Sequence, residues 1–337
     1  MDLLTTLQSG LLSPMVLAFV LGAVAALVRS DLKIPESLHA ALTIYLLFAI
    51  GVKGGAKLEG VHPADLAGPL TAALALCLAI PVWSFAILRR LGGFDAVNAG
   101  AIAAHYGSVS VVTFGAALAF LDSRHIAHEP FMPALLAVME VPAILVALYL
   151  VRRTEAKPGV VPATALGFLP AAGGGDRGLF RELLTSKGIV LLLGGMVIGR
   201  VSGKAGFEQV APLFDTPFRG VLTLFLLEVG LVAGQRVRDL RTAGPFLAAF
   251  AILMPVFHGL LGVWLGHTVG LGVGGATVLG TLAASASYIA APAAVRVALP
   301  SANPALYLTS ALAITFPFNV VVGIPTYFAF ASWLYAA

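Results

Sequence analysis

Charged residues and cysteine are scarce in this sequence. Asp, Glu, Lys and Arg make up 11% of its 337 residues, against about 25% in soluble domains, so a water-soluble enzyme is excluded. Cys77 is the only cysteine, which excludes an intrachain disulfide and a cysteine-based zinc or cluster site. The sequence also lacks the P-loop, Gly-x-Ser-x-Gly and His-Glu-x-x-His motifs that mark nucleotide binding, serine hydrolysis and metalloprotease chemistry.

Hydrophobic residues are abundant instead. They make up 59% of the chain, about 199 residues, and the mean hydropathy is +0.97. Because one helical crossing of a bilayer takes roughly 20 apolar residues, this supply is enough for about ten crossings and leaves little for an extramembrane domain. The net charge of +4 comes from basic residues in short loops, where they set orientation. We therefore expect an all-α membrane protein with no nucleic-acid partner.

Apolar runs separated by charges, glycine or proline predict ten transmembrane helices, at residues 11–28, 36–53, 66–90, 98–121, 131–151, 187–203, 210–233, 244–267, 272–299 and 305–335. The residues before the first run include Asp2 but no Lys or Arg. The first run therefore lacks the basic region of a cleaved signal peptide and is expected to remain as a span. The long polar stretch 152–186 contains Gly-Gly-Gly and is predicted to be a flexible linker. It divides the chain into halves 1–151 and 187–337.

The two halves resemble each other. LTIYLL at 42–47 recurs as LTLFLL at 222–227, and AGAIAAHYGSVS at 99–110 aligns with LGTLAASASYIA at 279–290. Gly68-Pro69 and Gly244-Pro245 each fall near the start of a third span, and Pro142 aligns with Pro317, so the offsets stay between 175 and 180 residues. Because each half has five spans, the second must cross in the opposite direction, which predicts two inverted five-helix repeats.

Orientation follows from the basic residues. With the N-terminus outside, the inner loops hold 14 Lys and Arg residues and the outer loops hold 6. The positive-inside rule then places both termini outside and the 152–186 linker in the cytoplasm, for a multi-pass protein of the plasma (inner) membrane.

Polar residues interrupt the fourth and ninth spans at equivalent places. The fourth contains His105-Tyr106-Gly107-Ser108-Val109-Ser110, and the ninth contains Ser285-Ala286-Ser287-Tyr288 followed by Pro292. A break inside a spanning helix survives only where it lines a cavity or binds something, and matched breaks in both halves point to a site. We therefore expect discontinuous helices 4 and 9.

These breaks favour the binding of a small anion. Gly107 is expected to take up the turn, and Ser108 and Ser287 to cap the half-helices that follow, so that two positive dipole ends meet at the membrane midplane. In the two interrupted spans Arg296, near the end of the ninth, is the only Lys or Arg, which argues for a monovalent anion. Tight helix packing is the alternative and is favoured for the Ala and Gly positions; binding is favoured for the 105–110 cluster.

Two carboxylates lie near the middle or in the second half of a span, Glu140 and Glu228. A charge near the bilayer centre costs at least about 2.5 to 3.5 kcal/mol, so a function is the default interpretation. Glu140 precedes Pro142, and Thr315 and Asn319 flank the equivalent proline; such oxygens suit Na⁺ or an H⁺ relay. The alternative for both carboxylates is a protonated or hydrogen-bonded helix contact, and Glu228 has the further alternative of a subunit interface.

The histidines carry weaker signals. His105 alone is typical of a satisfied interior histidine and gains weight only from the adjacent break. His125 and His128 stand near Glu129 in an outer loop without further ligands, and we expect no metal there. His258 is expected to be a packing residue.

Three long motifs resemble the SbtA-type sodium-dependent bicarbonate transporter family. They are AIAAHYGSVSVVTF at 101–114, SASYIAAPAAVRVALPSANPALYL at 285–308 and ALAITFPFNVVVGIPTY at 311–327, and the resemblance extends over essentially the whole chain. It implies two inverted repeats, a core domain of helices 3–5 and 8–10, and a scaffold of helices 1, 2, 6 and 7. It further implies a homotrimer, Na⁺ as coupling ion, and bicarbonate uptake by an elevator motion.

The resemblance also implies roles for particular residues. Those expected around bicarbonate are Ala104, His105, Tyr106, Gly107, Ser108, Ser110, Ser285, Ala286, Ser287 and Tyr288. Those expected at Na⁺ or just behind it are Thr113, Glu140, Thr315 and Asn319. A PII-like cytoplasmic regulator is a further expected partner, although the 152–186 linker offers little recognisable docking sequence.

Two alternatives to Na⁺-coupled bicarbonate uptake stay open. One is Na⁺- or H⁺-coupled transport of another small anion, a short monocarboxylate or sulfate. The other is an intramembrane serine hydrolase that uses Ser108 or Ser287 with His105; the missing motif and the duplicated layout count against it.

Overall fold

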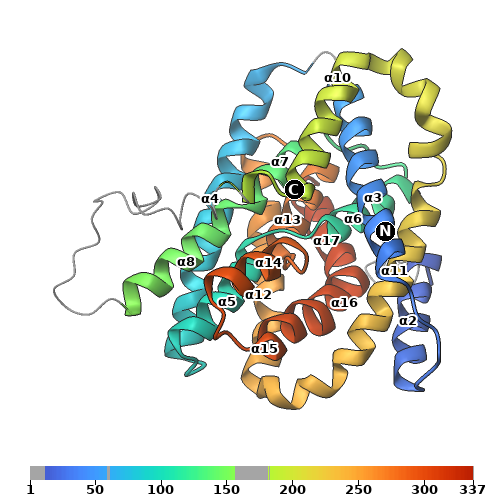
Figure 1. Cartoon of the computed structure of the whole chain (residues 1–337). Helices are drawn as coiled ribbons and strands as arrows, with labels where there is room; N and C mark the ends of the chain where they lie inside the picture. The colour runs from blue at the N-terminus through green and yellow to red at the C-terminus, as the bar shows by residue number, and fades with distance from the viewer. Residues whose placement is uncertain (1–11, 59–60, 156–180, 182, 337) are drawn as a thin grey trace.

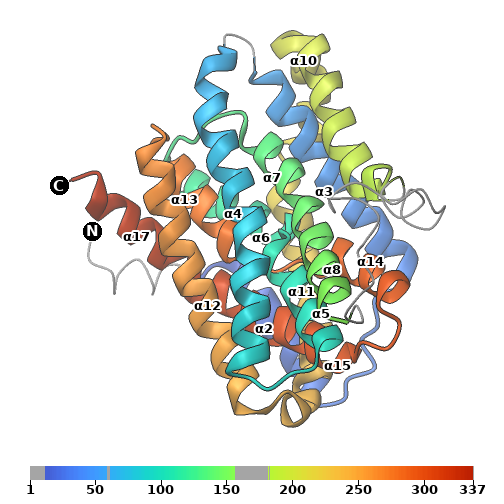
Figure 2. The same ribbon diagram turned by 90° about the vertical axis from the view of Figure 1, so that its left-hand side faces the viewer.

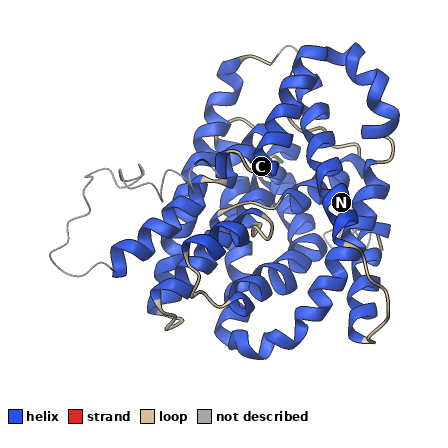
Figure 3. Cartoon of the chain, in the orientation of Figure 1, coloured by secondary structure: helices blue, strands red, loops and turns tan. Residues whose placement is uncertain are grey.

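A computed structural model gives the structure of the chain, and it describes residues 12–58, 61–155, 181 and 183–336. Within these ranges every regular element is helical (Figure 3). The elements in the first half are α2 (Pro14–Leu27), α3 (Glu36–Ala56), α4 (Pro63–Arg90), α5 (Ala96–Gly107), α6 (Val111–Ser123), α7 (Met132–Glu140) and α8 (Pro142–Glu155). Those in the second half are α10 (Lys187–Phe214), α11 (Phe218–Arg236), η1 (Val237–Asp239), α12 (Leu240–Thr268), α13 (Val273–Ala284), α14 (Ala290–Ala298), α15 (Pro304–Leu308), η2 (Thr309–Thr315), α16 (Phe316–Phe318), η3 (Asn319–Gly323) and α17 (Ile324–Leu334).

The helices fit a multi-pass membrane protein. In the described part of the chain, eight helical segments are long and apolar enough to cross a bilayer, and α2 and α13 are shorter apolar helices. Together these ten segments overlap the ten predicted runs in order. The expected all-α membrane architecture is therefore confirmed, while ten crossings remain a prediction.

Both expected helix breaks are present. The chain leaves helical geometry at residues 108–110, between α5 and α6, and at residues 285–289, between α13 and α14. A third break, at Val141 between α7 and α8, was not predicted, although Pro142 explains it because proline lacks the N–H that would continue the helix. The last span also contains two π-helical stretches, η2 and η3, of the kind that often marks functional sites.

One predicted boundary is confirmed and the next is wrong. The sixth run was expected to end at residue 203, and Gly203, whose φ of +63° suits glycine, interrupts α10 there before helical turns continue to Phe214. The seventh run was expected to begin at residue 210, but α11 begins at Phe218. The two Gly-Pro landmarks also differ in structure. Gly244 has a φ of +74° and breaks the start of α12, whereas Gly68 lies inside α4, which begins at Pro63.

Glycines bring four helices into close contact. α2 packs on α11, and α3 packs on α10. A Cβ on Gly55 or Gly199 would collide with backbone across the α3–α10 contact, and one on Gly22 or Gly230 would do the same across the α2–α11 contact. Small residues at a contact between membrane helices let the two backbones approach closely. These four helices, the glycine-packed group, occupy one side of the molecule, at the right in Figure 1.

The remaining helices pack in two corresponding sets. In the first half, α4, α5 and α8 contact one another; in the second half, α12, α13 and α17 do so. Figure 2 shows α4, α8 and α12 on the face turned away from the glycine-packed group. The broken segments 108–110 and 285–289 thus lie between two layers of helices.

Candidate functional site

The two broken segments cross and are hydrogen-bonded to each other. The Ser287 N–H donates to the His105 carbonyl oxygen over 2.8 Å, and the Ser110 N–H donates to Ser285 Oγ over 3.0 Å. All four residues are buried. An unpaired backbone N–H or carbonyl group is costly in a membrane. These two bonds provide partners for some of the backbone groups that the breaks leave free. We call residues 108–110 and 285–289 the crossing.

A serine hydroxyl binds the first turn of each helix that leaves the crossing, but neither predicted serine stands at the cap position. Ser287 Oγ accepts from the Ala291 N–H in the first turn of α14 over 3.2 Å, whereas the N-cap residue of α14 is Ile289. The cap of α6 is Ser110, which accepts from the Thr113 N–H over 3.2 Å, and not Ser108. Ser108 ends α5, because the extended segment runs two residues further than expected, and its hydroxyl donates to the Glu140 carbonyl oxygen over 2.7 Å.

Gly107 does not provide the turn. Its backbone remains helical at the end of α5 and does not have a positive φ. A Cβ at this position would lie 2.8 Å from both Ala143 Cβ and Pro81 Cδ. Close packing against α4 and α8, rather than backbone freedom, is therefore the reason for glycine here.

A cavity of about 320 Å³ opens beside the crossing. Its lining comes from both halves of the chain and consists of Leu47, Val109, Ser110, Val111, Glu140, Leu183, Thr185, Ser186, Lys187, Gly188, Ser287, Tyr288, Ile289, Ala290, Ala293, Ala294 and Val297. Ser110, Ser287 and Glu140 are buried, whereas Thr185, Lys187 and Val297 are exposed. The cavity therefore has a buried polar floor and an exposed rim at the start of α10.

The residues expected around bicarbonate divide into two groups. Ser110, Ser287 and Tyr288 line the cavity. The others lie behind it, among buried groups: Ala104, His105, Tyr106, Gly107, Ser108, Ser285 and Ala286. The His105 ring bonds to the Ala101 carbonyl oxygen through Nδ1 over 2.7 Å, and its Nε2 is buried without a partner.

The residues expected at Na⁺ are also separated. Glu140 ends α7 and lines the cavity; it is 5% exposed, and its Oε2 has no hydrogen-bond partner. Thr113 lies in the first turn of α6, beside the capping Ser110. Among the described residues, no cluster of three His, Cys, Asp or Glu side chains could hold a metal, so any Na⁺ site here would depend on one carboxylate with neutral oxygens.

Thr315 and Asn319 already have protein partners. The Thr315 hydroxyl donates to the Ala251 carbonyl oxygen over 2.6 Å and accepts from the Tyr106 hydroxyl over 2.7 Å. The Asn319 amide donates to the Ala284 carbonyl oxygen over 2.8 Å, and its Oδ1 accepts from a tyrosine hydroxyl. Both residues hold the π-helical part of the last span against the end of α13 and the middle of α12, away from the cavity lining.

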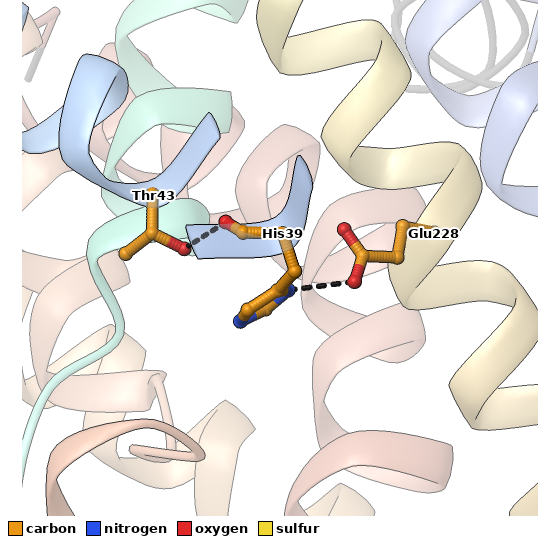
Figure 4. Close-up of polar contacts among 3 residues, drawn as sticks. All are labelled: His39, Thr43 and Glu228. Atoms are coloured by element: carbon orange, nitrogen blue, oxygen red, sulfur yellow. Dashed lines mark hydrogen bonds and ion pairs between the residues drawn. The ribbon is translucent and has the colours of Figure 1, made fainter. Parts of the chain in front are cut away.

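The second buried carboxylate, Glu228, is paired. Its Oε1 lies 2.7 Å from His39 Nδ1, and the Thr43 hydroxyl donates to the His39 carbonyl oxygen over 2.8 Å (Figure 4). Glu228 is on α11 and His39 on α3, so the pair joins two helices of the glycine-packed group. This is the hydrogen-bonded helix contact that stood as an alternative at the level of sequence, and no local pattern had singled out His39.

The rim at the start of α10 was not predicted from the sequence. The linker prediction includes Leu183, Thr185 and Ser186, but these residues line the cavity together with Lys187. A signal for this helix start was present, because Ser186 before an apolar run is a typical cap, and its hydroxyl accepts from the Ile189 N–H over 3.4 Å. Gly188 faces Glu140, since a Cβ there would lie 2.8 Å from Glu140 Oε1.

The other histidines have structural neighbours. His258 Nε2 accepts a hydrogen bond from Trp83 Nε1 over 2.7 Å, which links α12 to α4. His128 bonds the carbonyl oxygen of Glu129, and the Glu129 carboxylate accepts from the Gly272 N–H over 2.6 Å at the start of α13. Burial lowers the pKa of His128, so this loop histidine is mainly neutral near pH 7.

Comparison with known proteins agrees with this architecture. No curated protein matches the sequence. The profile of the Na⁺-dependent bicarbonate transporter superfamily matches residues 14–332, which include the crossing, the cavity and both glycine-packed helix pairs. The match covers nearly the whole chain, and the protein therefore belongs to the Na⁺-dependent bicarbonate transporter superfamily.

Proposed function

We propose that the protein is a secondary active transporter of the plasma membrane that couples bicarbonate uptake to Na⁺. The observation that carries this proposal is the crossing, in which two interrupted helices meet beside one buried cavity. Interrupted helices near the midplane are how many secondary transporters build a binding site. The family supplies the identity of the anion and of the ion.

The cavity floor has the chemistry for a small anion. α6 and α14 both begin there, and their first N–H groups and dipole ends favour negative charge. Ser110 and Ser287 add hydroxyl groups from opposite halves. A small planar anion such as bicarbonate can accept from N–H groups and exchange hydrogen bonds with the serines.

Glu140 supports the coupling to Na⁺. Its carboxylate lines the same cavity and has an oxygen without a partner, although an ionised carboxylate by itself would repel an anion. Na⁺ prefers oxygen ligands, and its charge would offset that of the carboxylate. Na⁺ held at Glu140 would therefore make the cavity favourable for bicarbonate, which is a physical basis for moving the two together.

The transport motion in this proposal is an elevator built on ten crossings in two inverted repeats. Three pairs of contacts support the repeats. If α2 is equivalent to α10 and α3 to α11, the contact of α2 with α11 in one half is matched by the contact of α10 with α3 in the other. The mutual contacts of α4, α5 and α8 are likewise matched by those of α12, α13 and α17. The Glu129 carboxylate accepts from the Gly272 N–H at the start of α13, and Asn98 Oδ1, near the start of α5, accepts from the Asn303 N–H over 2.8 Å.

In this arrangement the glycine-packed group is the scaffold. The third to fifth spans (α4–α8) and the eighth to tenth spans (α12–α17) form the moving core. Both termini lie outside and the linker faces the cytoplasm. The family resemblance extends the proposal to a homotrimer and to a PII-like cytoplasmic regulator; most of the expected docking segment, residues 156–180, lies outside the described residues.

Reconstituted uptake tests the proposal. Proteoliposomes should accumulate labelled bicarbonate when an inward Na⁺ gradient is imposed, and neither protein-free liposomes nor a K⁺ gradient should do so. Unlabelled bicarbonate should compete more strongly than sulfate or acetate. Uptake that does not depend on Na⁺ would contradict the proposal, and stronger competition by sulfate or acetate would favour the other-anion alternative.

The hydrolase alternative has little support in the geometry. The Ser108 hydroxyl donates to a carbonyl oxygen, Ser287 Oγ accepts from a backbone N–H, and His105 Nδ1 bonds to a carbonyl oxygen. Neither serine hydroxyl is therefore bonded to the ring of the histidine that would activate it. A fluorophosphonate probe should label neither serine; labelling that Ser108→Ala or Ser287→Ala removes would favour the hydrolase.

A further inference from the structure

One cationic side chain belongs to the cavity. Among the described residues that line it, Lys187 alone carries a positive charge. Lys187 is exposed at the rim, and the described part of the chain contains no ion pair that involves it. From the sequence, Arg296 is the one cation expected near the breaks; the cavity lining contains Lys187 instead.

The floor and the rim of the cavity belong to different groups of helices. Ser110, Ser287 and Glu140 come from the broken helices of the proposed core, whereas Lys187 is the first residue of α10, which packs on α3 through Gly199 and Gly55. A close glycine contact of this kind fixes α10 to the scaffold. Any movement of the core along the scaffold would therefore change the distance between Lys187 and the floor.

The side on which this rim lies follows from the proposed orientation. The rim residues Leu183, Thr185 and Ser186 form the end of the 152–186 stretch, which contains five Lys and Arg residues, and Lys187 comes directly after it. In the proposed orientation this is the cytoplasmic side. The cavity in this structure is thus open toward the linker, with Lys187 at its mouth.

We propose that Lys187 is a binding residue for the transported anion on the linker side only, so that it sets the affinity of the inward-open site and not of the outward-open one. This inference rests on the proposed function. A lysine at a cavity mouth acts as a flexible point charge that attracts an anion without the geometric demands of arginine. When the core moves to its outward position, the anion leaves the reach of Lys187, and the affinity from outside depends on the floor alone.

Two vesicle orientations test the proposal. Bicarbonate transport is measured in right-side-out and inside-out membrane vesicles from cells that produce Lys187→Met, Lys187→Arg or the unmodified protein. At low salt, Lys187→Met should raise the bicarbonate KM about 5- to 10-fold in inside-out vesicles. It should leave the KM in right-side-out vesicles unchanged, and Lys187→Arg should restore most of the affinity.

Arg200→Met is the matched control. Arg200 is another exposed cation on α10, further along the helix and absent from the cavity lining, and its removal should change neither KM. The Na⁺ dependence of transport is recorded in the same vesicles. If Lys187 acted only by altering the binding of Na⁺ at Glu140, its substitution would change the Na⁺ dependence. Lys187→Met should leave the Na⁺ dependence as it is.

Several outcomes would overturn the inference. An equal rise in KM from both sides, an unchanged KM in inside-out vesicles, or an altered Na⁺ dependence would each remove Lys187 from the proposed role while leaving the proposed function intact. Absence of Na⁺-dependent bicarbonate transport by the unmodified protein would overturn both the function and the inference.

Discussion

Glu140 and Glu228 are both buried carboxylates inside spans, but their surroundings differ. Glu228 is held by His39 at 2.7 Å, and both residues belong to the glycine-packed group. The Oε2 atoms of both carboxylates are buried without a partner, but among the described residues no side chain pairs with Glu140 as His39 does with Glu228, and Glu140 lines a cavity between the two halves. A buried carboxylate with a protein partner joins two helices, whereas one without a partner facing a cavity is available to an ion. The partner, rather than the residue type or the depth, separates the two roles.

The largest difference should come from neutralising the unpartnered carboxylate. Glu140→Gln keeps the shape of the side chain but removes the charge that would hold Na⁺, so the Na⁺ concentration for half-maximal uptake should rise about tenfold or more. The thermal stability of the purified protein should not fall, because an orphan buried charge is itself costly. Uptake in proteoliposomes across a series of Na⁺ concentrations measures the first effect, and an unchanged Na⁺ curve would remove Glu140 from the coupling.

The paired carboxylate should respond in the opposite way. His39→Ala leaves Glu228 buried without its hydrogen bond, so the protein should lose about 1.5 to 3 kcal/mol of stability. The Na⁺ concentration for half-maximal uptake should stay the same. Thermal unfolding in detergent measures the loss, and the double variant His39→Ala/Glu228→Leu should recover part of it, because no unpaired charge is left. A shifted Na⁺ curve with intact stability would show that the two carboxylates share one role.

A glycine beside Glu140 allows a finer test. Gly188→Ala would place a methyl group 2.8 Å from Glu140 Oε1, so the carboxylate must shift, and the Na⁺ concentration for half-maximal uptake should change about two- to threefold. Gly194→Ala on the same helix is the matched control, since no atom outside its own stretch of α10 lies within 4 Å of its added Cβ. Equal effects of the two substitutions would mean that helix propensity, and not the contact with Glu140, is responsible.

The sequence predicted the breaks of the fourth and ninth spans well, because a cluster of Gly, Ser and Pro within an apolar run is a strong signal for an interrupted helix in a membrane. It could not place single hydroxyls. Ser108 and Ser110 are both good caps by residue type, and the choice between them depends on how far the extended segment runs before α6 begins. That length is set by the partner segment 285–289 across the crossing, which no local pattern reveals.

Long-range neighbours account for the remaining differences. Thr315 and Asn319 have the oxygens that Na⁺ prefers, but the Thr315 hydroxyl already bonds to the Ala251 carbonyl and Asn319 Oδ1 already accepts from the Tyr327 hydroxyl. Lys187 had the sequence context of a linker boundary, and only the packing of α10 on α3 brings it to the cavity. His39 likewise gains its meaning from Glu228, 189 residues further along the chain. Local patterns predict where a helix starts or breaks, but not which side chain from a distant helix completes a contact.

The smallest effect on transport should come from Ser108, which contacts the backbone of Glu140 but not its carboxylate. The Ser108 hydroxyl donates to the Glu140 carbonyl oxygen over 2.7 Å and does not line the cavity. Ser108→Ala therefore removes one neutral hydrogen bond, worth about 0.5 to 1.5 kcal/mol, without changing the charge of the site. The Na⁺ concentration and the bicarbonate KM should each shift less than about twofold. Ser123→Ala is the control, because its hydroxyl makes a similar bond to the Phe120 carbonyl oxygen at the far end of α6. A loss of uptake for Ser108→Ala as large as for Glu140→Gln would show that the anion or the ion contacts this hydroxyl directly, and that the cavity floor extends deeper than Ser110.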